Sequence, residues 1–137
     1  MNYLFEWTAD LSVGQETIDE QHKQLLNQIN IMLSAIVNDL EDAVIDQAID
    51  FLKEYIDGHL KYEEEYMAQN DYPHLALHRK DHQDFIDNYA RLKTKREGGV
   101  SDKLVAAEIE QYLGSWLIEH IRHVDQKYAD FIRHKNA

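Results

Sequence analysis

The sequence predicts an all-α protein, an antiparallel up-down-up-down four-helix bundle with an N-terminal extended arm. Hydrophobic residues make up 44% of the 137 residues, the helix breakers are limited to 5 Gly and 1 Pro, and apolar residues recur at helical spacing in four long segments. The short connections between these segments imply that neighbouring helices are antiparallel. We expect one domain over residues 1–137, with the arm at 1–16 and the bundle at 17–134.

The predicted arm carries aromatic residues at alternate positions. Tyr3, Phe5 and Trp7 precede Gly14, a pattern that indicates an extended strap packed over the bundle rather than a helix. The first helix is expected over residues 18–38, after a capping box formed by Thr17 and Glu20. Its predicted apolar stripe is Leu25, Leu26, Ile29, Leu33, Ile36, Val37 and Leu40.

The second and third helices follow from caps and breakers. Asp39 with Asp42 resembles an N-cap, and the apolar spacing then continues as far as Gln69. Pro73 suits the first turn of the third helix, which ends at the Gly pair 98–99. The predicted inner residues of these two helices are Ile45, Ile49, Leu52, Ile56, Leu60, Met67, Leu75, Phe85, Tyr89 and Leu92.

The fourth helix is expected to begin at a cap formed by Ser101 or Asp102. Its predicted stripe is Leu104, Ile109, Tyr112, Leu113, Trp116, Leu117, Val124 and Phe131. No internal repeat or linker interrupts the four segments, which supports a single bundle.

Composition excludes several classes of function. The 26 acidic and 14 basic residues give a formal net charge of -12, which opposes binding to nucleic acid or to an anionic membrane surface and favours a monomer. With no Cys there is no thiolate metal site and no Cys nucleophile. The longest apolar stretch, residues 31–37, is far shorter than the roughly 20 residues of a membrane-spanning helix. The N-terminus also lacks the basic start of a secretory signal, so we expect a cytoplasmic protein.

Five of the eight histidines fall on the predicted inner faces. His22 precedes the stripe of the first helix, and His120 follows that of the fourth. On the second helix His59 is four residues before Glu63, and the third helix carries a histidine pair with the same spacing, His78 and His82. Residues four apart lie on one side of a helix. Each helix therefore directs at least one imidazole into the core.

A single buried histidine is usually satisfied by one carbonyl or hydroxyl group. Five imidazoles and a carboxylate in one small core would leave many polar atoms without partners, at about 1–3 kcal/mol each. A metal accepts the imidazole lone pairs and neutralises the carboxylate, so the pattern predicts a metal site. We expect His74, His123 and His134 to be exposed or outside the ligand set, and Glu64 and Glu65 to belong to a solvated face.

Asp125 follows His120 by five residues. On a straight α-helix the two side chains would diverge by about 140°, so they could not share a metal centre. Either Asp125 is an ordinary surface acid, or the helix is locally widened between them, as π-type turns at functional sites allow.

Taken in chain order, these motifs resemble those of the bacterial hemerythrins, non-haem di-iron oxygen-binding four-helix bundles. The resemblance spans nearly the whole chain. It includes the Trp7 region, I-D-x-Q-H ending at His22, H-x-x-x-E at His59, H-x-x-x-H at His78, and H-x-x-x-x-D at His120. It implies that Asp125 is a bridging carboxylate.

The resemblance also implies a complete ligand set for two non-haem iron ions bridged by an oxo or hydroxo group. One iron would be bound by His78, His82 and His120, the other by His22 and His59, and Glu63 and Asp125 would bridge them. The second iron is then one ligand short, and dioxygen binds reversibly at that position in this family. The implied oxygen pocket is lined by Leu60, Trp116, Leu117 and Ile121.

Alternative functions remain open beside oxygen storage, transport or sensing. A di-iron oxidase or peroxidase typically uses Glu-x-x-His pairs, which this sequence lacks. An iron-storage protein needs a shell and entry channels that a 137-residue bundle does not indicate. A hydrolase with a single zinc would leave several of the histidines unexplained. The identity of the metal depends on the resemblance rather than on ligand spacing. The expected partners are dioxygen and an unidentified oxygen-consuming protein.

Overall fold

The computed structural model describes residues 5–136 and confirms the four-helix bundle. Helices α1 (Glu16–Val37), α2 (Asp42–Gln69) and α3 (Leu75–Glu97) form three of its four rods. The fourth rod is a continuous helical run of five segments: α4 (Asp102–Glu108), η2 (Ile109–Ser115), α5 (Trp116–His120), η3 (Ile121–Asp125) and α6 (Gln126–Lys135).

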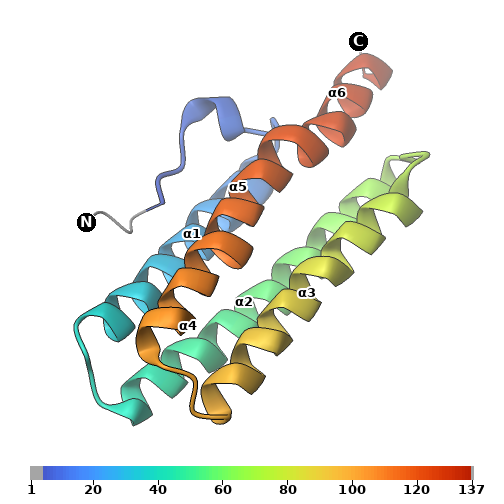
Figure 1. The fold of residues 1–137 in the computed structure, drawn as a ribbon. Coiled ribbons are helices and arrows are strands. Elements are labelled where there is room, and N and C mark those ends of the chain that lie inside the picture. The colour runs from blue at the N-terminus through green and yellow to red at the C-terminus, as the bar shows by residue number, and fades with distance from the viewer. Residues whose placement is uncertain (1–4, 137) are drawn as a thin grey trace.

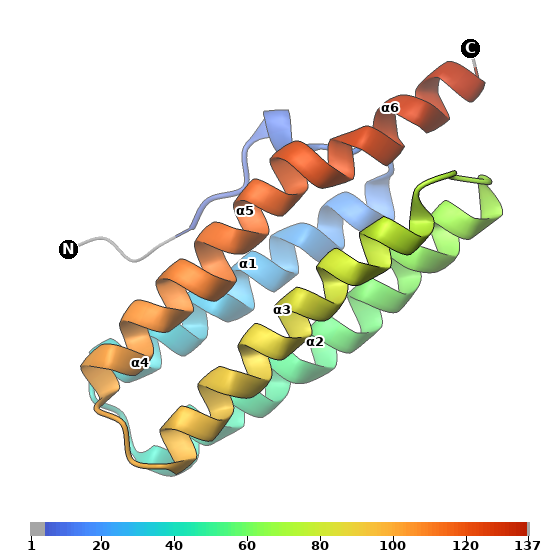
Figure 2. The ribbon, with the colours of Figure 1, turned by 45° about the vertical axis from the view of Figure 1, so that its right-hand side comes forward.

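The rods lie side by side with alternating direction. The α1–α2 and α3–α4 connections lie at one end of the bundle and the α2–α3 connection at the other, while α6 extends past the other rods at that second end (Figure 1, Figure 2). Among the described residues, no helix has both the length and the hydropathy that crossing a membrane requires.

The helix starts differ from three of the predicted caps. Helix α1 begins at Glu16, and the side chain of Gln15 accepts the Ile18 N–H at 2.7 Å. The predicted capping box of Thr17 and Glu20 is therefore wrong, because both residues already lie inside the first turns of α1. The extended backbone of Gln15 positions its side chain for this role.

The starts of α2 and α3 are also shifted. Asp39 has a φ of 52° and lies before the actual N-cap residue of α2, Glu41, so the predicted Asp39 cap is wrong. Pro73 precedes the N-cap of α3, His74, instead of lying in the first turn. The reason is that the His74 carbonyl accepts the first helical hydrogen bond, from His78 at 3.1 Å. The predicted Ser101 cap is confirmed.

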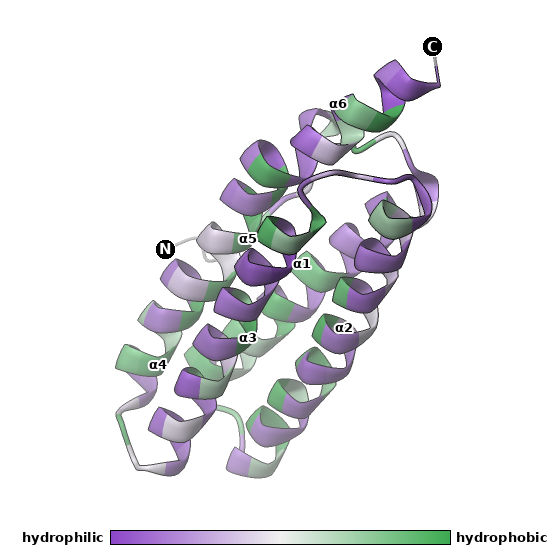
Figure 3. Cartoon of the chain, turned by 90° about the vertical axis from the view of Figure 1, so that its right-hand side faces the viewer, coloured by the Kyte–Doolittle hydropathy of each residue, from purple (hydrophilic) through white to green (hydrophobic). Residues whose placement is uncertain are grey.

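The core has two apolar clusters with a polar layer between them. Along α2, Ile56 and Leu60 belong to the larger cluster, Met67 belongs to the smaller one, and Glu63 lies between. The smaller cluster consists of Val13, Ile18, Met67, Tyr72, Tyr128, Ala129 and Ile132. Figure 3 shows how hydrophobic and hydrophilic residues alternate along each rod.

Four residues predicted to face inward are exposed. Val37 is the last residue of α1, Leu40 lies beyond that helix, and Leu104 lies in the first turn of α4. Tyr112 lies within η2, a π-helical segment that changes the phase of the apolar stripe. Helix ends and phase changes therefore account for these errors.

The described part of the arm packs on the bundle as a strap interrupted by one 3₁₀ turn, η1 (Ala9–Leu11). The side chain of Asn30 binds both backbone groups of Phe5, at 2.8 Å from its N–H and 2.9 Å from its carbonyl. A Cβ atom at Gly114 would overlap the Phe5 ring, so glycine in η2 permits this close approach. Tyr3, which was predicted to belong to the strap, lies outside the described residues.

Candidate metal centre

The polar layer contains all seven residues that the family resemblance implies as ligands. Their exposed fractions range from 0% to 6%, and they are the buried polar and charged residues of the described part of the chain: His22, His59, Glu63, His78, His82, His120 and Asp125. They form two groups that share Glu63, and within each group the ligand atoms lie within 4.8 Å of one another.

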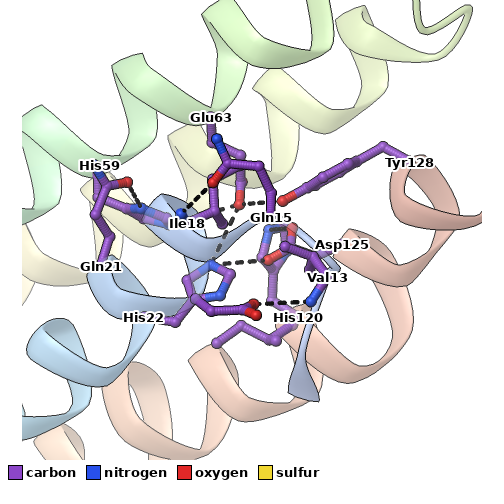
Figure 4. Close-up of polar contacts among 12 residues, drawn as sticks. Val13, Gln15, Ile18, Gln21, His22, His59, Glu63, His120, Asp125 and Tyr128 are labelled. Carbon is purple, nitrogen blue, oxygen red and sulfur yellow. Dashed lines mark hydrogen bonds and ion pairs between the residues drawn. The ribbon is translucent and has the colours of Figure 1, made fainter. Parts of the chain in front are cut away.

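The smaller group contains His22 from α1 and two residues of α2, His59 and Glu63. The Nε2 atom of His22 lies 3.3 Å from Glu63 Oε2 and also 3.3 Å from Asp125 Oδ2 (Figure 4). His59 Nε2 lies 3.7 Å from the same Glu63 oxygen. Two imidazoles therefore face one oxygen of Glu63.

The larger group faces the opposite oxygens of the same carboxylates. His78 Nε2 lies 3.1 Å from Glu63 Oε1 and 3.0 Å from Asp125 Oδ1. His82 Nε2 is 2.8 Å from Glu63 Oε1, and His120 Nε2 is 3.0 Å from Asp125 Oδ1. Each carboxylate thus directs one oxygen toward each histidine group.

A π-helical turn places Asp125 in this layer. Segment η3 covers Ile121–Asp125, directly after His120. Its wider turn returns residues five apart to one side of the helix, which a regular α-helix would not do. Asp125 is fully buried, so of the two alternatives left open by the sequence, the locally widened helix is correct.

Several buried atoms of the layer lack hydrogen-bond partners. These atoms are both ring nitrogens of His22, Nε2 of His120 and both carboxylate oxygens of Asp125. Their close contacts with opposite charges do not have hydrogen-bond geometry. Of these atoms, Nε2 of His22, Nε2 of His120 and the Asp125 oxygens lie against one another. Burying such atoms costs free energy unless something binds them, so their arrangement fits a bound metal.

Comparison with known proteins agrees with this geometry. The family model described as the hemerythrin HHE cation binding domain matches residues 13–132. The chain belongs to the hemerythrin family. Within that family, the buried His/Glu/Asp cluster fits a non-haem di-iron site.

Named relatives cover most of this hemerythrin-family chain. A bacteriohemerythrin of Stenotrophomonas maltophilia is 32% identical over 130 residues, which are 95% of this chain and 82% of the relative. A bacteriohemerythrin of Clostridium acetobutylicum is 29% identical over 93% of this chain and 100% of the relative. A hemerythrin-like protein of Naegleria gruberi is 31% identical over 90% of both chains.

Without metal, the histidines divide by their surroundings. Burial by itself would lower the pKa values of His22 and His78. The adjacent Asp125 and Glu63 carboxylates outweigh burial, and the pKa of each imidazole is raised from 6.5 to about 9. Burial dominates at His59 and lowers its pKa to about 4. Protonated imidazoles therefore take the place that metal ions would occupy as counter-charges to the carboxylates.

The two carboxylates remain ionised despite their burial. Burial raises the pKa of Glu63, but contacts with His22, His78 and His82 lower it well below its usual value. The pKa of Asp125 is likewise raised by burial and by Glu63 but is lowered overall by His120 and His22. The layer thus holds two negative charges ready to neutralise cations.

Three polar side chains of the site were missed in the sequence. The Tyr128 hydroxyl donates to Glu63 Oε2 at 2.9 Å, Gln21 Oε1 lies 2.9 Å from His59 Nδ1, and Glu64 Oε2 lies 2.8 Å from His82 Nδ1. Glu64 was assigned to a solvated face, but its side chain is only 24% exposed because it binds this imidazole. A histidine that binds a metal usually donates its second ring N–H to an acceptor, and this requirement could have indicated Gln21 and Glu64.

The other predicted residues lie as follows. Leu60, Leu117 and Ile121 are buried in the larger apolar cluster. Trp116 is half-buried and stacks on His120, with ring centroids 4.7 Å apart and an interplanar angle of 11°. The histidines predicted outside the ligand set are exposed: His74, His123 and His134.

Proposed function

We propose that this protein binds dioxygen reversibly at a di-iron centre, for oxygen storage, transport or sensing. The proposal depends on one observation: Glu63 and Asp125 each direct one carboxylate oxygen toward the two-histidine group and the other oxygen toward the three-histidine group. A carboxylate placed in this way can bridge two metal ions. The proposed terminal ligands are His78, His82 and His120 for one iron, and His22 and His59 for the other.

The unequal histidine count supports a ligand-binding position. With both carboxylates shared, the side of His22 and His59 offers one protein ligand fewer than the opposite side. A ferrous pair held by these residues would offer the open position and would supply the two electrons that dioxygen binding requires. The protein holds its ligands in fixed orientations around it.

The apolar neighbours support reversibility. Leu60 follows His59 in α2, while Leu117 and Ile121 flank His120 on the fourth rod, and all three are at least 95% buried. We propose that they exclude water and proton donors from the binding position, because protonation would let the ligand leave as hydrogen peroxide instead of dioxygen and would leave the iron oxidised. Trp116, stacked on His120, is proposed to hold that imidazole in its ligating orientation.

The test is a cycle of anaerobic reduction, oxygen titration and oxygen removal, followed by visible absorption. We expect two irons per chain, a visible band when oxygen binds, and recovery of the reduced spectrum when it is removed. Oxidation without recovery would support the oxidase or peroxidase alternative. A colourless protein containing one zinc per chain would overturn the proposal.

Leu117→Ala tests the proposed pocket. Removing this buried side chain should admit water and speed autoxidation of the oxygenated protein. The matched control is Leu113→Ala, which makes a similar cavity one turn earlier in the same cluster. Equal autoxidation rates in the two variants would show that Leu117 does not guard the site.

A further inference from the structure

Two side chains outside the proposed ligand set contact the far edges of ligand imidazoles. His59 Nδ1 is 2.9 Å from Gln21 Oε1, and His82 Nδ1 is 2.8 Å from Glu64 Oε2. Both acceptors are oxygens, so each imidazole donates its Nδ1–H outward. The opposite nitrogens face Glu63, at 3.7 Å for His59 and 2.8 Å for His82. Each contact therefore selects the tautomer whose Nε2 lone pair points into the centre.

The two contacts are divided between the two histidine groups. His82 belongs to the three-histidine group and His59 to the two-histidine group. Within residues 5–136, these are the members of the cluster whose Nδ1 atoms have a hydrogen-bond partner. Each proposed iron would thus have one histidine ligand whose outer ring nitrogen, Nδ1, donates a hydrogen bond to a neighbouring side chain.

The two supporting groups differ in charge. Glu64 is a carboxylate, and Arg79 holds its other oxygen, with Nε 3.1 Å from Oε1. Gln21 is a neutral amide that is half-buried. A carboxylate behind a ligand histidine draws its proton outward and makes the inner nitrogen a stronger donor, whereas an amide oxygen orients the ring with a weaker effect.

We infer that Glu64 and Gln21 are positioning residues that make the two metal ions electronically unequal. Glu64 acts through His82 to stabilise the oxidised state of the three-histidine iron. Gln21 acts through His59 to fix the ring without adding negative charge, so the iron with the open position stays easier to reduce. This inference rests on the proposed function, because it concerns how readily the same centre would take its two electrons back when dioxygen is released.

The experiment measures the reduction potential of the iron-loaded protein by spectroelectrochemistry. Glu64→Gln should raise the potential, and it should release ferrous ion to a chelator about 10–100 times more readily. The matched control is Glu65→Gln, which removes the same charge from the next, exposed position of α2. Equal potentials and equal release in the two variants would overturn the role of Glu64.

The converse variant tests Gln21. Gln21→Glu places a carboxylate behind His59 and should lower the potential, whereas Gln24→Glu adds the same charge to an exposed position of α1. A merely structural role for Gln21 would lower thermal stability without moving the potential beyond that of the Gln24→Glu control. That result would overturn the role of Gln21.

Failure of this inference is distinguishable from failure of the proposed function. If the wild-type protein holds two irons but never releases dioxygen, the proposed function fails while the potentials still test the two positioning residues. If it retains no iron, the affinities of the same variants for cobalt(II) provide the test. Unchanged cobalt affinity in Glu64→Gln relative to Glu65→Gln would then overturn the inference.

Discussion

The same four rods build two very different interiors. At the end where α1 meets α2 and α3 meets α4, the core is apolar, with Leu33, Leu52 and Leu92 at 2% exposure or less. Toward the end where α2 meets α3, the interior becomes the polar layer around Glu63 and Asp125. The side chains of both regions are buried, but burial stabilises the fold in the apolar region and destabilises it in the polar layer unless the charges are paired.

The difference separates the origin of stability from the origin of function. Apolar burial contributes roughly 25 cal/mol per Å² whichever close-packed residues supply it. Buried imidazoles and carboxylates lower stability unless protons or metal ions pair their charges. The apolar end therefore maintains the bundle, and the polar layer depends on that support and on what it binds.

The largest expected effect concerns the polar layer. His78→Ala should lose bound iron, because it removes a proposed ligand and leaves Glu63 and Asp125 without one of their counter-charges. Iron analysis after reconstitution measures this. His123→Ala, an exposed position on the fourth rod, is the control and should keep full iron content. Equal iron in the two variants would contradict the assignment.

The next effect concerns the apolar end. Leu33→Ala should lower the free energy of unfolding by about 2–5 kcal/mol, because it leaves a cavity in the larger cluster. Denaturant titration measures this change. At a temperature where the variant is folded, its iron content should equal that of the wild type. Loss of iron from the folded variant would mean that the two regions are not separable.

The pH dependence of the folding stability of the metal-free protein should depend on the histidines of the polar layer and not on the apolar end. His22 and His78 have folded pKa values of about 9, raised from 6.5, so the stability they contribute is complete below pH 6.5 and is lost as the pH rises to about 9. His59 has a lowered pKa of about 4, so its contribution is lost as the pH falls from 6.5 toward 4. Stability should therefore be greatest near pH 6.5.

Thermal unfolding from pH 4 to 9, with and without iron, measures this profile. The expected change is on the order of a few kcal/mol from pH 6.5 to 9. Metal binding requires deprotonated imidazoles, so iron should remove or reverse the loss at high pH. A flat profile for the metal-free protein above pH 6.5 would show that protons do not replace metal in the layer.

The smallest effect is local. Ser101→Ala removes the side chain that accepts the Leu104 N–H at the start of α4, which should cost about 1 kcal/mol. Since Ser101 lies at the apolar end, the visible spectrum of the iron-loaded protein should not change. A changed spectrum would show that a substitution at the start of α4 alters the structure of the polar layer.

The fold was predictable because most of the chain repeats one helical period. The four rods and their inward histidines follow from that period, and residues such as Ile49 and Phe85 are buried as predicted. The caps of the first three rods were less predictable, because a Gln side chain caps α1, and Glu41 and His74 precede α2 and α3 without a side-chain cap hydrogen bond.

The positions of the proposed ligands were predictable in part for the same reason. A pair four residues apart, such as His59 and Glu63, follows directly from the helix. Asp125 does not, because a π turn depends on tertiary packing as well as on local preference. Tyr128 was missed because the stripe was continued through Val124 to Phe131, although Asp125, Tyr128 and Ile132 form a second stripe that starts after the wide turn.

The π turn of η3 also sets the angular position of everything after it. One extra residue in a helix rotates the following side chains by about 100°. Tyr128 and Ile132 thus reach the interior because of the same irregularity that buries Asp125. If all five residues Ile121–Asp125 followed a regular α-helix, the carboxylate and the entire C-terminal segment would turn outward, whereas deleting one residue from the turn would keep both facing inward, with the carboxylate four residues after His120.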